Sequence, residues 1–293
     1  MRRFIVAACA AVVVTGGLAA CGSSAGNGSG SASPGASGSA ASCTKPALSH
    51  ELHTSGQLTV ATDNPVYTPW FVKNTPTNGK GYESAVAYAI AAKLGFSKSE
   101  VTWVKEPFSK AYAPGPKAFD FDINEVSVTP QRAQVVTFSN SYYSVQQAIV
   151  ARKGSPIVTK HSAAQLKTYL YGDQNGTTGL AYITDKIQPT KQPKVFDTLD
   201  QAAAALEAGR IDALVTDTPT AQYMASQQLK HPPTVLVAQF PTVGEHFGLV
   251  FAKGNPLVTC VNKAIAGLQS DGTLTALQKQ YLGIYLHFPT IKP

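Results

Sequence analysis

The feature that most constrains this sequence is an alternation of strand and helix patterns that begins near residue 57. Gln57 to Thr62 has the composition of a short strand, and residues 81 to 94 carry apolar side chains at helical spacing, ended by Gly95. Val101 to Val104 predicts the next strand, and a second crossover leads to another strand that starts at Asp120. Such a succession of strand, helix and strand predicts a parallel α/β sheet.

A strand-to-helix junction contains the sharpest local motif. Asp120 to Val128 alternates as a strand does, Thr129 is a suitable N-cap, and Pro130 suits the first position of a helix. At this junction the Ser127 hydroxyl, free backbone N–H groups and the Arg132 guanidinium can converge on one anion. The planar fork of Arg132 best matches a carboxylate or phosphate. The alternative is a solvated Arg132 in a weak surface pair.

Two strands with similar ends predict two lobes. Lys153-Gly154-Ser155-Pro156 and Lys253-Gly254-Asn255-Pro256 each follow a strand that borders the middle of the chain. We expect lobe 1 to be discontinuous, with residues 43 to 147 and 247 to 293, and lobe 2 to hold residues 148 to 246. Each lobe is expected to be a mostly parallel sheet flanked by helices, and the two strands are the hinge crossings. Because open α/β sheets bind ligands beyond the carboxyl ends of strands, the lobes are expected to enclose a cleft.

Residues 1 to 20 have the pattern of a signal peptide. Met1-Arg2-Arg3 precedes an apolar run from Phe4 to Val14, which is short for a bilayer span. Small residues then lead to Cys21 in an arrangement that resembles the bacterial lipobox, whose Cys carries lipid. The expected location is extracytoplasmic, on the outer face of the cell membrane, with Cys21 as the lipid anchor. The alternative is ordinary secretion with a free Cys21.

Residues 21 to 42 form the predicted lipid-anchored linker. After Cys21 it contains only Gly, Ser and Ala except for Asn27 and Pro34, a composition that cannot bury a core. Its root-mean-square reach is roughly 25 Å, from the scaling of flexible chains. A folded body tethered in this way can work near a membrane surface.

Charge argues against a nucleic-acid partner. Removing Arg2 and Arg3 from the 24 Lys and Arg leaves 22 against 17 Asp and Glu, a net charge of +5. The basic residues are scattered, with no run and no aromatic interleaving. A mildly positive net charge suits contact with the anionic head groups of lipids as well as it suits contact with nucleic acid. The sequence also has no metal-ligand spacing, so neither a metal nor a cofactor is expected.

Two cysteines remain in the folded body. Cys9 lies in the signal peptide and Cys21 is the lipid candidate, which leaves Cys43 and Cys260 as an even pair in an exported protein. The favoured interpretation is a disulfide between them, which ties the start of the folded body to a late helix. The alternative is two unpaired buried thiols.

Several ordered motifs between Gly56 and Tyr285 resemble the bacterial extracellular solute-binding proteins of family 3, the amino-acid receptors of ABC importers. They are, in chain order, Thr129-Pro130-Gln131-Arg132, Val135 to Ser139, Tyr142-Tyr143, Gly176-Thr177-Thr178, and Gly209 to Ala213 with Asp217. The resemblance implies a type II periplasmic-binding-protein fold and a monomeric receptor without enzymatic activity. Such a receptor captures a free amino acid between its lobes and delivers it to a membrane permease.

The resemblance also implies how the amino-acid backbone of the ligand is held. Arg132 and Ser127 hold the α-carboxylate, with further contacts from Thr177 and Thr178 at the start of a second-lobe helix. Asp217 holds the α-ammonium. The alternative for Thr177 and Asp217 is a role as helix cap, which does not exclude ligand contact.

A second group of residues is expected to face the ligand side chain. The resemblance assigns Tyr67 and Phe108 to its flanks, and the alternative is that both are core residues. Asp63 follows the first strand and is expected to face the ligand as well. Trp70 stands where the family commonly has Phe, so either Tyr67 or Trp70 can stack on the ligand. Glu125 replaces a usually small residue, and an acid there favours a polar or basic side chain, or strengthens the ammonium site. The alternative is a surface or second-layer acid.

Two rival functions stay open at this level. Some proteins of this fold are enzymes, either dehydratases of the prephenate or arogenate type or glycan-cleaving lyases, and both need an acid in the cleft. Glu125 is the candidate for that acid, and no Ser/His/Asp arrangement is apparent. The other rival is a ligand sensor without a transport partner.

Overall fold

The computed structural model describes residues 43–160, 162–241, 244–283 and 290. The predicted signal peptide, the lipid-anchor candidate Cys21 and the linker that follows it lie outside these residues. Within the described ranges, no helix is both long and apolar enough to cross a membrane.

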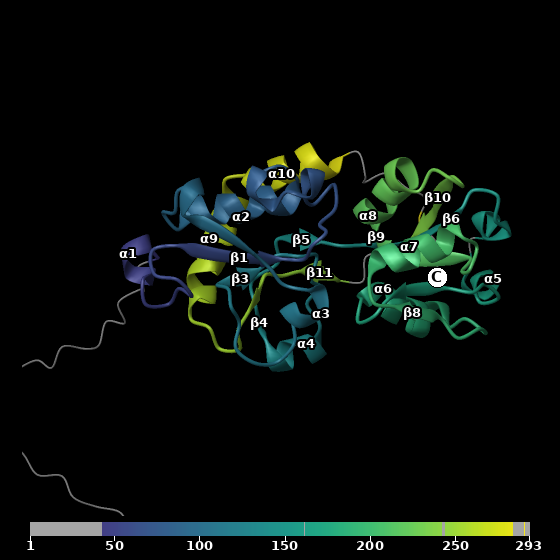
Figure 1. Ribbon diagram of the computed structural model, residues 1–293, viewed down its shortest axis with the longest axis horizontal. Helices are drawn as coiled ribbons and strands as arrows, with labels where there is room; N and C mark the ends of the chain where they lie inside the picture. The colour runs from purple at the N-terminus through teal and green to yellow at the C-terminus, as the bar shows by residue number, and fades with distance from the viewer. Residues whose placement is uncertain (1–42, 161, 242–243, 284–289, 291–293) are drawn as a thin grey trace, which may run out of the picture. The chain divides into compact units, whose positions relative to one another are not determined.

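The sheet of lobe 1 begins with three parallel strands, as the sequence predicts. β1 (Leu58–Thr62) is buried along its whole length and lies between β2 (Val101–Lys105) and β3 (Phe121–Asp122). β12 (Val250–Phe251) returns from the late part of the chain and pairs antiparallel with β3 and with β4 (Thr137–Phe138). The strand order is β2-β1-β3-β12-β4. Residues from both ends of the folded body therefore build one sheet (Figure 1).

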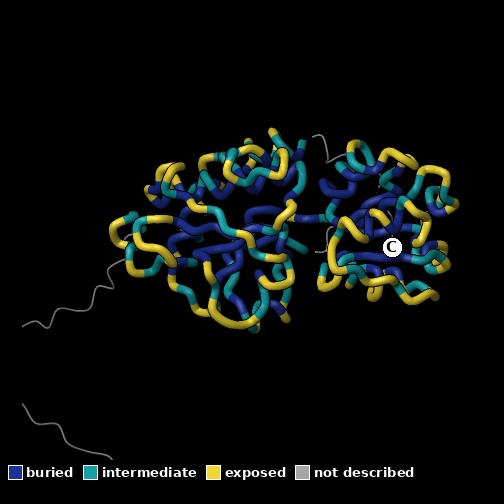
Figure 2. The backbone as a smooth tube through the Cα atoms, viewed as in Figure 1, coloured by how far each residue is buried: buried dark blue, intermediate teal, exposed yellow. Residues whose placement is uncertain are grey.

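Helices from both ends of the folded body cover this sheet. The long ones are α2 (Tyr82–Lys93), α9 (Leu257–Ser270) and α10 (Thr273–Leu282), which pack against one another. Their apolar faces and β1 form a single core (Figure 2). The short elements of this lobe are α1 (Lys45–Leu48), α3 (Phe108–Ala111), α4 (Pro130–Val135), the paired β5 (Tyr143–Ser144) and β11 (His246–Phe247), and the 3-10 turns Val72–Asn74, Pro76–Asn78 and Lys98–Glu100.

Lobe 2 has a three-stranded antiparallel sheet beside one parallel strand pair, which corrects the expectation of a mostly parallel sheet. β6 (Gln147–Arg152) is flanked by β9 (Ala213–Asp217) and β10 (Thr234–Gln239), and both pairings are antiparallel. β7 (Gly172–Gln174) and β8 (Lys194–Phe196) pair in parallel, and Tyr171 bridges them to β9. The crossing between the lobes explains the direction of β6. This strand enters lobe 2 from lobe 1 at the edge where β9 ends, because its first residue pairs with the last residue of β9. The two strands therefore run in opposite directions.

Helices complete the second lobe (Figure 1), and its buried apolar residues form two clusters. The elements are α5 (Ala163–Leu166), α6 (Thr178–Tyr182), α7 (Leu199–Glu207) and α8 (Thr218–Tyr223), π-helical segments Ile183–Ile187 and Met224–Gln228 after α6 and α8, and the 3-10 turn Pro156–Thr159. The fold is therefore two-lobed and α/β, as predicted. The sequence boundaries given above for the lobes stay predictions.

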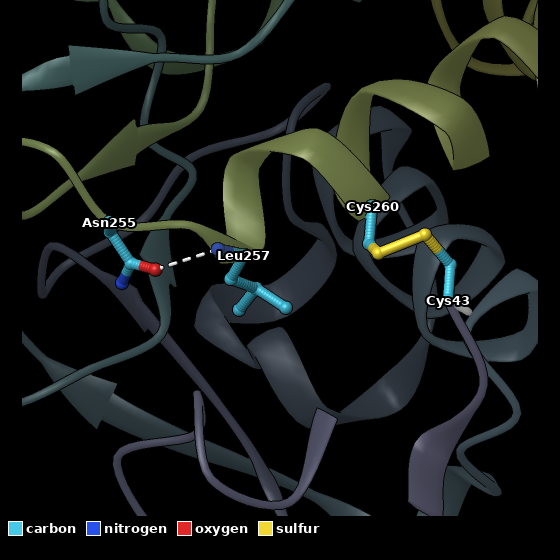
Figure 3. The surroundings of a disulfide bond; sticks show 4 residues. All are labelled: Cys43, Asn255, Leu257 and Cys260. Carbon is cyan, nitrogen blue, oxygen red and sulfur yellow. Dashed lines mark hydrogen bonds between the residues drawn. A yellow bond between two sulfur atoms is a disulfide. The ribbon is translucent and has the colours of Figure 1, made fainter. Parts of the chain in front are cut away.

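The predicted disulfide is present. Cys43, the first described residue, is bonded to Cys260 in α9 (Figure 3). Asn255 lies at the start of this helix, and its side-chain oxygen accepts a hydrogen bond from the Leu257 backbone N–H at 2.9 Å. The disulfide between Cys43 and Cys260 therefore ties the start of the folded body to a late helix, as expected.

The strand-to-helix junction differs from the prediction in its first half. The strand expected over Asp120 to Val128 covers only the two residues of β3, because Glu125 adopts a left-handed backbone conformation with φ 53°. The Glu125 N–H leaves the sheet and donates to the buried Glu83 carboxylate at 2.7 Å. The second half is confirmed: Thr129 caps α4 by accepting from the Arg132 N–H at 3.2 Å, and Pro130 is the first helical residue.

Candidate ligand-binding site

A cleft between the lobes brings together most of the residues selected from the sequence. Its empty volume is about 670 Å³, counting the part open to solvent. The selected residues that line it are Asp63, Tyr67, Phe108, Glu125, Arg132, Thr177, Thr178 and Asp217. They lie at the carboxyl ends of β1, β2, β3, β7 and β9 or in the loops and short helices that follow, where an open α/β fold is expected to bind.

The other two selected residues, Ser127 and Trp70, do not line the cleft. Ser127 is buried, and its hydroxyl donates to Glu245 at 2.7 Å and lies 3.3 Å from the Thr178 hydroxyl. Trp70 is fully buried, and its indole N–H donates to the Thr220 hydroxyl at 2.7 Å. Tyr67 is thus the aromatic of the first loop that faces the cleft.

Arg132 is buried rather than solvated, with 8% of its surface exposed. Its Nη1 donates to the Ser127 carbonyl at 2.6 Å and its Nη2 to the Gly176 carbonyl of the other lobe at 2.8 Å. The Tyr112 ring covers one face of the guanidinium, with its centroid 4.2 Å from Cζ. Burial lowers the pKa of Arg132, but a guanidinium stays protonated in proteins. Since it has five N–H donors, some remain for an anion in the cleft.

The start of α6 presents hydroxyl groups beside Arg132. Thr177 caps this helix by accepting from the Leu180 N–H at 3.0 Å, and its own hydroxyl donates to the Gln174 carbonyl at 2.9 Å. Gly179 lies so close to β9 that a Cβ atom there would be 2.3 Å from the Val215 carbonyl oxygen. This glycine lets the helix start approach the strand that carries Asp217.

Asp217 faces the cleft from the end of β9 and makes no side-chain cap to α8. Its Oδ1 accepts a hydrogen bond from the Gln147 side chain at 2.7 Å. Burial raises the pKa of Asp217 well above its ordinary value, and the nearby Glu245 and Asp173 raise it further. A carboxyl group in this position favours a positively charged partner, which would restore its ionised form.

Sequence reasoning missed three polar groups that line the cleft. Asp173 is 1% exposed, and its Oδ2 has no hydrogen-bond partner among the described residues. Asn124 and Gln147 also line the cleft, and each has one unpartnered amide atom within the same set. The rule that sites follow strand ends would have pointed to Asp173, which is next to the last residue of β7. Gln147 begins a strand, so that rule does not reach it.

Behind the cleft wall lies a fourth missed residue, Glu83. It is fully buried and accepts hydrogen bonds from the Glu125 N–H and from the Tyr142 hydroxyl. Burial raises the pKa of Glu83 from 4.5 to about 7. Burial also raises the pKa of Glu125 well above its ordinary value, and Glu83 and Asp217 add to this effect. An acid in the first turn of a helix is common, so the sequence carries no signal for this role.

The buried Glu83 predicts a pH dependence of stability. The folded protein keeps a proton that the unfolded chain loses between pH 4.5 and about 7, so the stabilisation is fully present below pH 4.5 and is lost as pH rises through 7. We expect the unfolding free energy of the ligand-free protein to fall across this window, by up to about 1.4 kcal/mol per pH unit for one proton. Urea unfolding at a series of pH values measures it.

The matched variant for this prediction is Glu83→Gln. Its amide oxygen can still accept from the Tyr142 hydroxyl and the Glu125 N–H, while the titrating proton is removed. The pH slope of the variant should be flatter than that of the parent. An unchanged slope would show that Glu83 titrates normally.

Comparison with known proteins identifies the family. The family model for bacterial extracellular solute-binding proteins, family 3, matches residues 58–284. The chain belongs to this family. As a solute-binding protein it is 28% identical over 209 residues to ABC transporter arginine-binding protein 1 of Escherichia coli (strain K12), covering 69% of this chain and 81% of that protein. It is also 28% identical to the histidine-binding periplasmic protein of Salmonella typhimurium (strain LT2), covering 77% and 87%.

Solved structures agree with the fold of this solute-binding protein. An ancestral arginine-binding protein bound to glutamine superimposes with a TM-score of 0.68 and is 30% identical. The match covers 79% of this chain and all of that one. The two-lobed architecture is therefore shared along nearly the whole folded body.

Proposed function

We propose that this protein is the substrate-binding component of an ABC importer, which captures a free amino acid, with a basic side chain favoured, and delivers it to a membrane permease. The observation that carries the proposal is the charge of the cleft. Arg132 is the positively charged residue among the described residues that line it, against the four carboxyl groups of Asp63, Glu125, Asp173 and Asp217. One cation and several acids suit a ligand with one carboxylate and more than one positive group.

The proposed carboxylate site combines Ser127, Thr177 and Thr178 with Arg132. On binding, the Ser127 and Thr177 hydroxyl protons, which Glu245 and the Gln174 carbonyl now accept, would turn to the ligand carboxylate beside the donors of Arg132. Its guanidinium is held in place by two backbone carbonyls and an aromatic face, so little side-chain entropy is lost on binding. Ser127 now donates to Glu245, and a ligand carboxylate would compete for that proton.

The proposed ammonium site is Asp217, which Gln147 holds through one carboxylate oxygen. The side chain of the ligand would lie between Tyr67 and Phe108 and reach Asp63 or Glu125, which both line the cleft. A neutral or acidic side chain would leave these carboxyl groups without a positively charged partner. The arginine- and histidine-binding relatives support a basic ligand, and the ancestral structure bound to glutamine supports a polar one.

The proposed mechanism is closure of the lobes on the ligand. Contacts already cross the cleft between Arg132 and Gly176 and between Tyr67 and Asp200. A zwitterion that touches Arg132 on one lobe and Asp217 on the other stabilises the closed form. A charge-assisted hydrogen bond contributes about 1.5 to 3 kcal/mol and micromolar binding needs about 8 kcal/mol, so these groups and side-chain burial suffice.

The location we propose is outside the cytoplasm, with Cys21 as lipid anchor and the following linker as tether. The periplasmic relatives support an extracytoplasmic site. The protein is proposed to act as a monomer beside its permease. Metabolic labelling with a fatty acid tests the anchor, because the label should be lost in Cys21→Ser.

Calorimetry against a panel of amino acids tests the proposed function. We expect arginine, lysine, ornithine or histidine to bind most tightly, glutamine more weakly, and glutamate and leucine weakest. Absence of binding by every member, with the fold intact by circular dichroism, would contradict an amino-acid receptor. Tightest binding of an acidic amino acid would contradict the charge argument alone.

The contact between Tyr67 and Asp200 predicts an effect on dissociation. The Tyr67 hydroxyl donates to the Asp200 carboxylate at 2.5 Å, from one lobe to the other. Tyr67→Phe keeps the ring but removes this bond, so we expect about tenfold faster ligand dissociation by stopped-flow fluorescence. Tyr281→Phe on α10, which does not line the cleft, is the control. Equal rates in parent and Tyr67→Phe would exclude a closing role for this contact.

A further inference from the structure

Three residues form a hydrogen-bonded chain that runs from the core of one lobe into the other lobe and back to the cleft. The Trp70 indole N–H donates to the Thr220 hydroxyl at 2.7 Å, and the Thr220 hydroxyl donates to Glu125 Oε2 at 2.9 Å. Trp70 is fully buried and Thr220 is 3% exposed, so water does not compete for either bond. Glu125, at the end of the chain, lines the cleft.

The chain crosses between the lobes twice. Trp70 packs edge-on against Tyr143 and Phe247 in the core of lobe 1. Thr220 lies on α8, which packs against the strands β6 and β9 of lobe 2. Both bonds therefore exist only while this part of lobe 2 is seated against lobe 1.

The chemistry of the donors fixes the direction of the chain. An indole N–H can only donate, so the Thr220 oxygen must accept from Trp70. The single proton of the Thr220 hydroxyl is then free for another acceptor, and Glu125 supplies it. Trp70 thereby makes Thr220 a dedicated donor to the Glu125 carboxyl group, rather than a hydroxyl that can rotate to other partners.

The backbone of Glu125 is fixed independently, by its left-handed conformation and its bond to Glu83. What remains to be set is where the carboxyl group points. We propose that Thr220 is a positioning residue, which aims the Glu125 carboxyl group at the ligand when the lobes are together and so links selectivity for a basic ligand to closure. This inference rests on the proposed function for its ligand, whereas the contact itself can be tested without one.

The first test uses a double-mutant cycle with L-arginine as probe. Thr220→Val keeps the shape and removes the hydroxyl, and we expect the affinity to fall about tenfold or more, since the lost bond is to a carboxyl group that the positive end of bound arginine would hold in its ionised form. Thr220→Ser restores the hydroxyl and should keep the affinity close to that of the parent. In a Glu125→Gln background the Thr220→Val change should cost much less than in the parent, because the side chain that Thr220 positions can no longer carry the negative charge that attracts the ligand.

Additive losses in that cycle would overturn the positioning role, because a merely structural threonine would cost the same in both backgrounds. Failure of Thr220→Ser to rescue would overturn it as well. If the parent protein binds no amino acid at all, the proposed function fails and so does the ligand-directed part of this inference.

The second test needs no ligand. The chain has two tryptophans, so the indole region of a ¹⁵N correlation spectrum contains two resonances, and Trp103→Phe assigns them. We expect the Trp70 indole proton to exchange slowly with solvent in the parent and in Thr220→Ser, and faster in Thr220→Val. Glu125→Gln should shift the Trp70 resonance through Thr220. Equal exchange in all variants, with no shift in Glu125→Gln, would overturn the chain itself.

Discussion

Replacement of Arg132 by alanine is expected to lower the affinity for the amino acid about a thousandfold, or about 4 kcal/mol, whichever side chain the ligand carries. The guanidinium is buried and pre-positioned by two carbonyls, and the cleft offers no other described cation to replace it. A ligand carboxylate would then be desolvated without a charged partner. Isothermal titration calorimetry with the best-bound amino acid measures the effect.

One further variant separates charge from geometry at this site, and another serves as the control. Arg132→Lys keeps the positive charge but loses the planar fork, so we expect an intermediate loss of affinity. Arg210→Ala removes an exposed arginine of lobe 2 and should bind as the parent does. Retained affinity in Arg132→Ala, with a folded protein, would remove Arg132 from the carboxylate role.

The second large effect is expected for Asp217→Asn, which should lower the affinity about a hundredfold, or about 3 kcal/mol. The amide is nearly the same size and its oxygen can still accept from Gln147, so the loss reflects charge rather than folding. Asp185→Asn, at an exposed position of the same lobe, is the matched control.

A ligand analogue tells which group of the ligand Asp217 contacts. 5-Guanidinopentanoic acid is arginine without its α-amino group. If Asp217 holds the α-ammonium, the variant and the parent should bind this analogue about equally weakly. An equal loss for arginine and for the analogue would show that Asp217 acts elsewhere.

Local sequence patterns predicted several elements of the fold, because neighbouring residues decide where such elements begin and end. Thr129 and Pro130 start a helix as their side chains and ring geometry require, and Thr177 does the same at α6. The disulfide followed from the parity of cysteines in an exported chain, and it needed no knowledge of the fold. The alternation of strands and helices gave the parallel half of lobe 1.

Features decided by distant partners could not be predicted in this way. The strand expected through Val128 breaks because Glu125 turns toward Glu83, which lies far away in sequence. The direction of β6 depends on its entry from the other lobe. Trp70 looked like a cleft aromatic, but Thr220 supplies a buried acceptor for its indole that only the folded chain brings near.

The role of Glu125 shows the same limit in the candidate site. Its position two residues before Ser127 marked it as unusual, and the sequence left a ligand contact, a catalytic acid and a second-layer acid open. The fold puts it on the cleft wall, with Thr220 bonded to its carboxylate and Glu83 bonded to its backbone. The groups around an acidic side chain decide its charge, and only the tertiary structure shows which groups these are.

The central claim is that opposite lobes hold the two charges of a zwitterionic amino acid. Its most direct test is a crystal structure of the protein with the amino acid that binds best. The account predicts closed lobes, with the α-carboxylate within hydrogen-bond distance of the Arg132 guanidinium and the α-ammonium on Asp217. The side chain should lie between Tyr67 and Phe108, with its positive end toward Asp63 or Glu125. A ligand with its carboxylate away from Arg132, or one bound outside the cleft, would contradict the account.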